Sequence, residues 1–298
     1  MPGPVAVVGV GNMGGAIAAR LLEQGWTVRV RDIAQDRMRA LAAAGALACA
    51  SAAEAATGCD ALIVCVVDAA QTDEVLFGPD GAAAALPAGA VVLLCPTIAP
   101  ADVERIAERL AAVGLAALDA PMSGGPARAR DGSMSLMVAG DDAAFNSARN
   151  LVEAISRQVF RIGPRLGDGA RTKLVNNLLA GINLAGAAEA LALAQRLGLD
   201  LAATLAVIER SSGQSWIGSD RLPRAIAGDY EPRAHVSLLH KDTRLALEAA
   251  RAAGFEGPLG PAAHAVFDAA MRAGMAGLDD AALFRLLADS HKEPPPSS

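Results

Sequence analysis

The sequence predicts a doubly wound α/β domain with a parallel sheet, followed by an all-α domain that a long helix joins to it. Short apolar runs alternate with helical patterns over 1–163, strand signals stop after Gly169, and one unbroken helical pattern covers 168–197. Near-continuous apolar strands between helices are typical of a parallel sheet that is covered on both faces.

The elements of the first part follow in order. Its apolar runs have the length and composition of buried strands: 5–10, 27–32, 61–67, 90–95, 115–120, 135–140 and 158–163. Helical patterns separate most of them, at 12–24, 34–43, 69–76, 100–113 and 142–154. The Gly- and Pro-rich stretch after Ala120 predicts a loop rather than a helix.

The long helix would extend roughly 45 Å at 1.5 Å per residue, too far for one small domain to bury along its whole length. We expect it to link two lobes or to cross a subunit interface. More helices are predicted near 200–210, 215–227, 237–253, 259–273 and 279–288. The predicted domains are therefore 1–163 and 164–291, followed by a disordered tail at 292–298 (KEPPPSS).

Composition limits the possible partners. The formal net charge is −6 and no run of Lys or Arg occurs, so we expect no nucleic-acid partner. The apolar stretch 178–194 approaches membrane length, but Asn183 and Glu189 favour a buried helix over a membrane span.

The cysteines and histidines lack the spacing of metal sites. We expect four buried, reduced thiols and no bound metal. Reduced thiols and the expected absence of a signal peptide predict a cytoplasmic protein.

A glycine pattern at 9–14 indicates a dinucleotide site. Gly9, Gly11 and Gly14 have the spacing G-x-G-x-x-G between an apolar strand and a helix. The first permits a tight turn, the second lets the backbone approach a pyrophosphate, and the third lets the helix pack closely on the strand. A glycine turn without a ligand is the alternative. The context favours a Rossmann-type domain.

Asp32 ends the next predicted strand and bears on the choice of cofactor. Its carboxylate should accept hydrogen bonds from ribose hydroxyls and repel a 2′-phosphate, which favours NAD over NADP. Arg31 and Arg37 leave NADP as the minority alternative.

A second glycine turn follows the strand that ends at Ala120. Ser123, Gly124 and Gly125 offer a hydroxyl and consecutive backbone N–H groups, a concavity that can hold a carboxylate. The carboxyl ends of strands are where α/β proteins bind ligands. An ordinary crossover loop is the alternative.

The long helix carries an ammonium and an amide four residues apart, Lys173 and Asn177, so both project from one face. A lysine that reaches solvent and an Asn that cross-links helices would explain them without chemistry.

Four motifs, in this order, resemble the β-hydroxyacid dehydrogenases, a family that includes 3-hydroxyisobutyrate dehydrogenases, tartronate semialdehyde reductases and threonate dehydrogenases. They are GVGNMG (9–14), DAPMSGGPARARDGSMSLMVAGD (119–141), GDGARTKLVNNLLAG (167–181) and LLHKDTRLALEAA (238–250). The resemblance extends to about residue 290. The segment 215–232 looks most like the branch that acts on small sugar acids.

The resemblance implies a role for each motif. Lys173 would be the catalytic acid–base, and Asn177 would position the substrate and the lysine. The residues implied to bind the substrate carboxylate or close the site are Ser123, Gly124, Gly125 and Lys241. The residues implied to bind the cofactor are Gly9, Gly11, Asn12, Met13, Gly14, Asp32, Val67 and Thr97.

This chemistry is reasonable in itself, because oxidising an alcohol requires a base for the hydroxyl proton while hydride leaves for nicotinamide. Desolvation and a second cation such as Lys241 would lower the pKa of Lys173 toward a useful range. A solvated Lys241–Asp242 pair is the alternative for that part of the site.

Three positions depart from the family pattern. The turn 163–169 carries one extra residue, Cys95 and Pro96 stand where serines are more common, and Asp68 stands where an Asn is common. These changes bear on the substrate more than on the reaction.

Two other functions remain as alternatives, an imine reductase and a non-catalytic dinucleotide-binding regulator. Lys173 and Asn177 favour a dehydrogenase of a small hydroxy acid over both. The small residues at 180–194 would allow close helix approach, so we expect a homodimer or a homotetramer.

Overall fold

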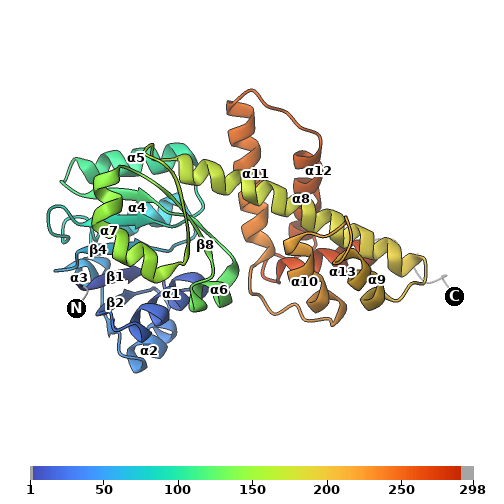
Figure 1. The fold of residues 1–298 in the computed structure, drawn as a ribbon, viewed down its shortest axis with the longest axis horizontal. Helices are drawn as coiled ribbons and strands as arrows, with labels where there is room; N and C mark the ends of the chain where they lie inside the picture. The colour runs from blue at the N-terminus through green and yellow to red at the C-terminus, as the bar shows by residue number, and fades with distance from the viewer. Residues whose placement is uncertain (1–2, 290–298) are drawn as a thin grey trace. The chain divides into compact units, whose positions relative to one another are not determined.

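The computed structural model describes residues 3–289, which fall into two compact units (Figure 1). The first unit ends at Lys173 and the second begins at Leu174. The predicted tail at 292–298 lies outside the described residues.

In the described part of the first unit, nine strands form one sheet in the order β3-β2-β1-β4-β5-β6-β8-β7, with β9 paired to β8. The strands are β1 Val5–Val8, β2 Val28–Arg31, β3 Leu47–Ala48, β4 Ala61–Val64, β5 Val91–Leu94, β6 Ala116–Asp119, β7 Met122–Ser123, β8 Ser135–Ala139 and β9 Gln158–Gly163. Strands β1 to β6 pair in parallel, which confirms the predicted fold class.

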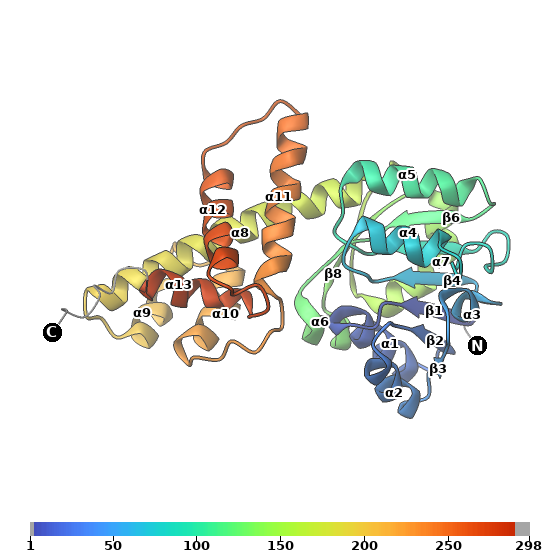
Figure 2. The ribbon, with the colours of Figure 1, turned by 180° about the vertical axis from the view of Figure 1, so that it is seen from behind.

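The sheet is covered by helices on both faces (Figures 1 and 2). These helices are α1 Asn12–Glu23, α2 Gln35–Ala43, α3 Ala52–Ala56, α4 Ala69–Phe77, α5 Pro100–Ala111, α6 Gly125–Asp131 and α7 Asp142–Ile155. Val5 and Val7 of β1 pack in a core with α1, α2 and α7, whereas Ala6 and Val8 pack in a second core with α3, α4 and α5. Alternate residues of one strand thus enter different cores, which explains why the strand is apolar throughout.

One expectation for the first unit was wrong. The predicted loop after Ala120 contains the helix α6, because Pro126 lies in its first turn, where the missing N–H costs no hydrogen bond. Strand β8, for which no orientation was predicted, is antiparallel to β6 and β7. The short connection through α6 reverses the chain, and a parallel return requires a longer crossover.

The second unit is helical, as predicted. Its elements are α8 Asp168–Arg196, which begins in the first unit, α9 Leu201–Ile208, α10 Trp216–Ile226, α11 Val236–Ala252, α12 Leu259–Arg272, the 3₁₀ helix η1 Asp280–Ala282 and α13 Leu283–Asp289. Gly181 lets α8 approach α11 and α12, because a Cβ there would lie 2.7 Å from Thr243 Cγ2 and 3.4 Å from Phe267 Cε2. Phe267 is fully buried in the core of this unit.

Within the described residues, α8 alone is long and apolar enough to span a membrane, and 44% of its most apolar window is buried in the protein. Core helices of soluble proteins meet the same test. The four cysteines are all free, three of them are buried, and Cys65 is half-buried rather than buried as predicted.

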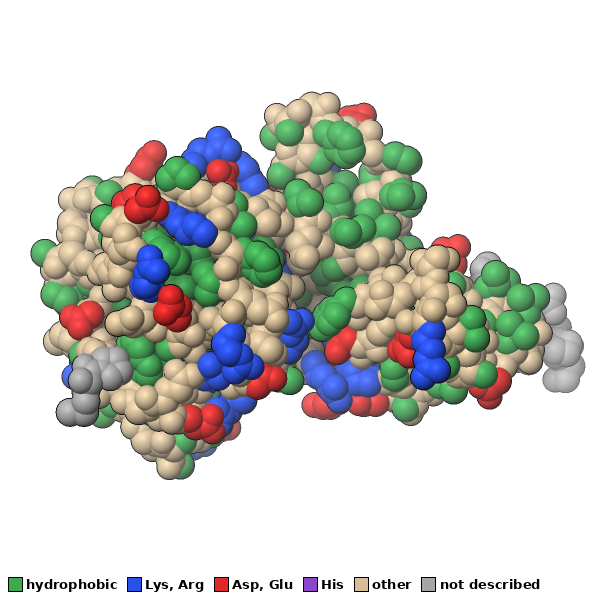
Figure 3. Space-filling model, in the orientation of Figure 1, with side chains coloured by type: hydrophobic (Ala, Val, Ile, Leu, Met, Phe, Trp, Pro, Cys, Tyr) green, Lys and Arg blue, Asp and Glu red, His purple; other side chains and the backbone are tan. Residues whose placement is uncertain are grey.

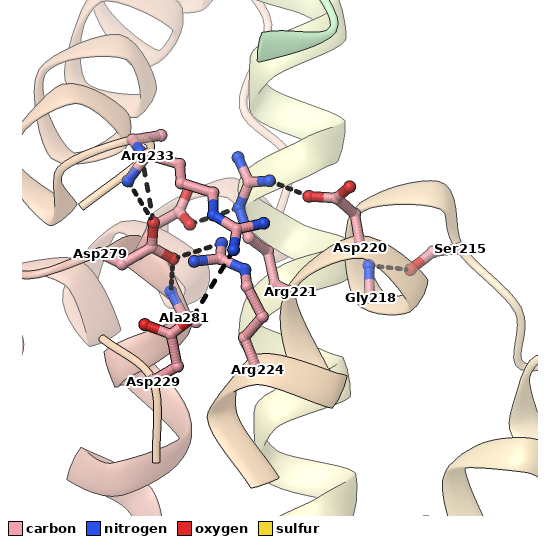
Figure 4. A network of polar contacts seen from close by, with 11 residues as sticks. Ser215, Gly218, Asp220, Arg221, Arg224, Asp229, Arg233, Asp279 and Ala281 are labelled. Atoms are coloured by element: carbon pink, nitrogen blue, oxygen red, sulfur yellow. Dashed lines mark hydrogen bonds and ion pairs between the residues drawn. The ribbon is translucent and has the colours of Figure 1, made fainter. Parts of the chain in front are cut away.

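A buried ionic network links α10 to Asp279 and Asp280, at the start of η1 (Figure 4). Arg224 Nη2 donates to Asp279 Oδ1 at 2.8 Å, and Arg221 Nε donates to Asp280 Oδ1 at 2.6 Å. Burial raises the pKa of Asp280 to about 7 against the opposing charge of Arg221. Burial would also raise the pKa of Asp279, but hydrogen bonds from Arg224 and from backbone N–H groups outweigh it and hold that pKa below its usual value.

Candidate active site

The first glycine turn joins β1 to α1 and has no room for side chains. Gly9 has a φ of +87°, and a Cβ there would lie 2.6 Å from the carbonyl oxygen of Cys65. A Cβ on Gly14 would lie 2.0 Å from the carbonyl oxygen of Gly9. The turn therefore brings bare backbone to the carboxyl edge of the sheet, where a pyrophosphate can approach it.

A cavity of about 490 Å³ opens beside this turn, in the first unit. Four of the residues that the sequence assigns to the cofactor are in its lining: Gly9, Gly11, Asp32 and Val67. The carboxyl ends of β1, β2 and β4 border it, because Val8, Arg31 and Cys65 also line it. Its position and its glycine edge fit the adenosine and pyrophosphate part of a dinucleotide.

The other predicted cofactor residues do not line this cavity. Asn12, Met13 and Gly14 form the start of α1, where Met13 packs against the core. Thr97 lies three residues beyond the end of β5, in the segment that contains Pro96.

Asp32 lines the cavity and also accepts two hydrogen bonds from backbone N–H groups. Its Oδ2 accepts from the backbone N–H of Val10 at 2.7 Å, and its Oδ1 accepts from the N–H of Ala34 at 2.8 Å. Asp32 thus orients the glycine turn directly. Each carboxylate oxygen has a further lone pair, so the same group can still accept from a ribose hydroxyl.

Arg31 and Arg37, which the sequence left as an argument for NADP, line the cavity beside Asp32. Gln71 and Glu74 line it from α4 and were not found from the sequence. Gln71 Oε1 accepts from the N–H of Val67 at 3.1 Å. The predicted end of the strand β4 could have indicated them, because the loops and helices that follow parallel strands carry ligand contacts.

Asp68, the acid that departs from the family pattern, caps α4. Its Oδ1 accepts from the backbone N–H of Gln71 at 2.8 Å. The side chain satisfies one of the free N–H groups of the first turn, but an Asn would do the same, so nothing in the structure explains the substitution.

The second glycine turn lies between β7 and α6. Gly124 and Gly125 have φ angles of +134° and +75°, which side chains rarely permit. Arg128 borders the turn, with its Nε 3.3 Å from the point where a Cβ of Gly124 would lie. Ser123, two exposed-backbone glycines and a nearby guanidinium are groups that attract an anion. The sequence analysis did not assign Arg128.

The start of α8 is anchored to the end of β6 by Asp119, a residue within the second motif that the sequence analysis did not assign. Its Oδ2 accepts from the N–H of Ala170 at 2.8 Å. A Cβ on Gly169 would lie 2.9 Å from the Asp119 carboxyl carbon, so the turn before the helix requires a glycine there. Burial raises the pKa of Asp119 to about 6, although backbone N–H groups of Ala170, Gly167 and Gly169 oppose the rise. This carboxylate fixes the helix one turn before Lys173.

Lys173 and Asn177 are both buried, each 7% exposed, whereas their neighbours Val175 and Asn176 are exposed. Since they are four residues apart on the unbroken helix α8, they share one face of it. The alternative in which Lys173 reaches solvent does not fit this burial.

In the second unit, Asn177 is held by a buried carboxylate. Asn177 Nδ2 donates to Asp242 Oδ2 at 2.6 Å, and Lys241 Nζ lies 2.8 Å from Asp242 Oδ1. Asp242 is 6% exposed. The Lys241–Asp242 pair is therefore not a solvated surface pair, and the structure brings Asn177, Asp242 and Lys241 into one cluster.

Comparisons with known proteins identify the family of this chain. Residues 4–163 match the model of the NAD binding domain of 6-phosphogluconate dehydrogenase, and residues 167–287 match that of the NAD-binding region of NADP-dependent 3-hydroxyisobutyrate dehydrogenase. The L-threonate dehydrogenase of Cupriavidus necator is 42% identical over 282 residues, which cover 95% of each chain.

Two further relatives come from other bacteria. The 3-hydroxyisobutyrate dehydrogenase of Pseudomonas aeruginosa is 37% identical over 270 residues, which cover 88% of this chain and 90% of that protein. A crystal structure of 3-hydroxyisobutyrate dehydrogenase from Salmonella typhimurium superposes with a TM-score of 0.90 at 38% identity, covering 95% of this chain and 99% of that one. The chain belongs to the β-hydroxyacid dehydrogenase family of NAD(P)-binding oxidoreductases.

Proposed function

We propose that this protein oxidises a small hydroxy acid with NAD and that Lys173 is its general base. The observation that carries the proposal is the pair of buried polar residues on one face of α8, Lys173 and Asn177, behind a helix start that Asp119 fixes. Lysine side chains are rarely buried, and this one shares its face of α8 with the buried amide of Asn177.

The proposed reaction assigns one task to each group. Lys173 takes the proton from the substrate hydroxyl and returns it to the carbonyl oxygen in the reductive direction. Asn177, fixed by Asp242, orients the lysine and the substrate. Ser123, Gly124 and Gly125 bind the carboxylate, and Lys241 adds a second positive charge. NAD, when bound, accepts the hydride on its nicotinamide ring.

L-threonate or a similar four-carbon sugar acid is the proposed substrate. Support comes from the relatives, since L-threonate dehydrogenases of several bacteria are 37–42% identical over 95% of this chain. A serine dehydrogenase and a 3-hydroxyisobutyrate dehydrogenase are 36% and 37% identical, so serine, glycerate, tartronate semialdehyde and 3-hydroxyisobutyrate are the comparison substrates.

The test is the absorbance of NADH while the purified protein is offered L-threonate, erythronate and these comparison substrates; tartronate semialdehyde is tested in reverse, as NADH consumption. We expect the highest kcat/KM with a four-carbon acid. A higher value with 3-hydroxyisobutyrate or serine would contradict the substrate and leave the reaction intact. Tight NAD binding without turnover of any compound would contradict the reaction itself.

NAD is the proposed cofactor because Asp32 lies in the cavity, where its charge would repel a 2′-phosphate. Arg31 and Arg37 line the same cavity and could attract that phosphate. The measurement is kcat/KM with each cofactor for the natural chain and for Asp32→Ser. We expect NAD to be preferred and the preference to narrow in the variant; a preference for NADP in the natural chain would contradict the assignment.

A homodimer is proposed from apolar side chains on α8 and directly after it. Val175, Leu179 and Leu193 on α8 and Leu197 after its end are exposed, in pairs four residues apart. Figure 3 also shows apolar side chains spread over the visible face of the helical unit. Light scattering at micromolar concentration should give a dimer or a tetramer, and a monomer would contradict the proposal.

A cytoplasmic location is proposed from the free thiols, and cell fractionation tests it.

A further inference from the structure

Three side chains that can bind metals meet between two helices of the second unit. His240 lies on α11, and His264 and Asp268 lie one turn apart on α12. Their ligand atoms all lie within 4.8 Å of one another. The two imidazole rings stack with centroids 5.0 Å apart and an angle of 17° between their planes.

The tautomer of His264 is set by Thr243, on the facing helix. Thr243 Oγ1 donates its hydrogen to the carbonyl oxygen of Leu239 at 2.8 Å. Because a hydroxyl has one hydrogen, the contact of 2.8 Å between Thr243 Oγ1 and His264 Nδ1 requires the imidazole N–H as donor. In neutral His264, the lone pair is therefore on Nε2.

That lone pair faces a carboxylate. His264 Nε2 lies 3.8 Å from Asp268 Oδ2, and His240 Nε2 lies 2.6 Å from Asp268 Oδ1. Two acceptors that face each other at this distance repel unless a cation lies between them.

We propose that His240, His264 and Asp268 form a binding site for a divalent transition metal such as Zn²⁺. The two Nε2 atoms and one carboxylate oxygen would be the protein ligands, a donor set that suits Zn²⁺. Asp268 is 41% exposed, so water can complete the coordination. The hydrogen bond that His264 Nδ1–H donates to Thr243 Oγ1 is the outer contact that a metal-bound histidine normally makes through its other nitrogen.

The cations near the site limit its affinity. Arg244, Arg251 and Arg272 act on His264 or Asp268 through their charges. Arg244 Nη1 is paired with Glu248 at 2.6 Å, which offsets part of that effect. The site uses none of the residues assigned to the proposed reaction and does not rest on it.

The experiment is a calorimetric titration of zinc chloride into the tag-free, chelator-treated protein at pH 7.5, with cobalt chloride absorbance as a second readout. We expect one Zn²⁺ per chain and a Co²⁺ spectrum without a thiolate charge-transfer band. His264→Gln, His240→Gln and Asp268→Asn should each weaken binding at least 10-fold. The control His235→Gln changes a histidine outside the cluster and should bind as the natural chain does.

Thr243→Val tests the tautomer argument, because it keeps the shape of the buried side chain and removes the hydroxyl. We expect about 10-fold weaker binding, the usual cost of losing such an outer contact. The proposal would be overturned if the natural chain bound no Zn²⁺ or if the Co²⁺ spectrum showed a thiolate band. It would also be overturned if all three ligand variants bound Zn²⁺ as tightly as the natural chain does. Circular dichroism verifies that each variant is folded, and Asp268→Asn, at an exposed position, keeps the test valid if a histidine variant unfolds.

Discussion

The nucleotide-binding unit and the helical unit position their polar groups in different ways. Beside the cavity of the first unit, a glycine turn presents bare backbone, and Gly9 and Gly14 leave no space for a Cβ. In the second unit, carboxylates are paired with amides and guanidinium groups from distant segments, as in Asn177–Asp242 and Arg224–Asp279. The first arrangement should be sensitive to added atoms and the second to lost charges or hydrogen bonds.

Lys173→Ala should have the largest effect, because it removes the proposed general base. We expect kcat to fall about 100-fold or more, the usual scale for such a group. NAD affinity should stay the same. The control is Gln195→Ala, at an exposed position on the same helix. Near-normal turnover in Lys173→Ala would remove the proposed role.

Gly14→Ala tests the sensitivity of the first unit to added atoms. The new Cβ would lie 2.0 Å from a backbone oxygen that cannot move aside easily. We expect a loss of about 2–3 kcal/mol in the stability of the unit, in line with overpacking elsewhere, and weaker NAD binding. Thermal unfolding and fluorescence titration with NADH measure the two. Unchanged values in both would mean that the turn is looser than described.

Asp280→Asn tests the charge sensitivity of the second unit through pH. The unfolded chain releases the Asp280 proton near pH 3.8, whereas the folded chain keeps it to about 7. Stability from this group is therefore full below about pH 4 and is lost as the pH rises to 7. The difference between the Tm of the variant and the Tm of the natural chain should therefore increase by roughly 5 °C between pH 4 and pH 7. A constant difference in Tm would show that Asp280 ionises normally.

Asn177→Ala compares two adjacent amides. It leaves the buried carboxylate of Asp242 without one of its donors, and we expect kcat/KM to fall about 10-fold. Asn176→Ala is the matched control, because that amide is exposed and donates only to Asn177 Oδ1 among the described hydrogen bonds. Equal effects of the two substitutions would show that Asn177 has no positioning role.

Gly186→Ala should have the smallest effect and the opposite sign to Gly14→Ala. This glycine is exposed within α8, and no described atom lies within 4 Å of the added Cβ. Replacing a glycine inside a helix should stabilise the unit by about 0.5–1 kcal/mol. Thermal unfolding measures the change. A destabilised variant with a weaker dimer would instead indicate that a subunit packs on this part of α8.

Most of the fold could be predicted because its signals are local. The strands β1, β4 and β5 are apolar at every residue, and α8 is one continuous helical pattern. The glycine turn at 9–14 could be predicted because its function depends on spacing along the chain. Helix α6 could not, since a proline is tolerated in a first turn and disruptive later.

The side-chain clusters could not be predicted, because their members are far apart in sequence. Asp242 is 65 residues from Asn177, and nothing local distinguishes a buried Lys–Asp pair from a solvated one. Asp119 reaches Ala170 across 51 residues. The cluster of His240, His264 and Asp268 likewise depends on how α11 and α12 pack.

The two guanidinium groups beside Asp32 have a consequence for evolution. Arg31 and Arg37 already line the cavity, so the positive charge that a 2′-phosphate needs is present. Under the proposed preference for NAD, Asp32 is the carboxylate nearest in sequence to these two arginines that opposes a 2′-phosphate. Its replacement would then give the chain access to NADPH, the more reduced coenzyme pool, through a single codon.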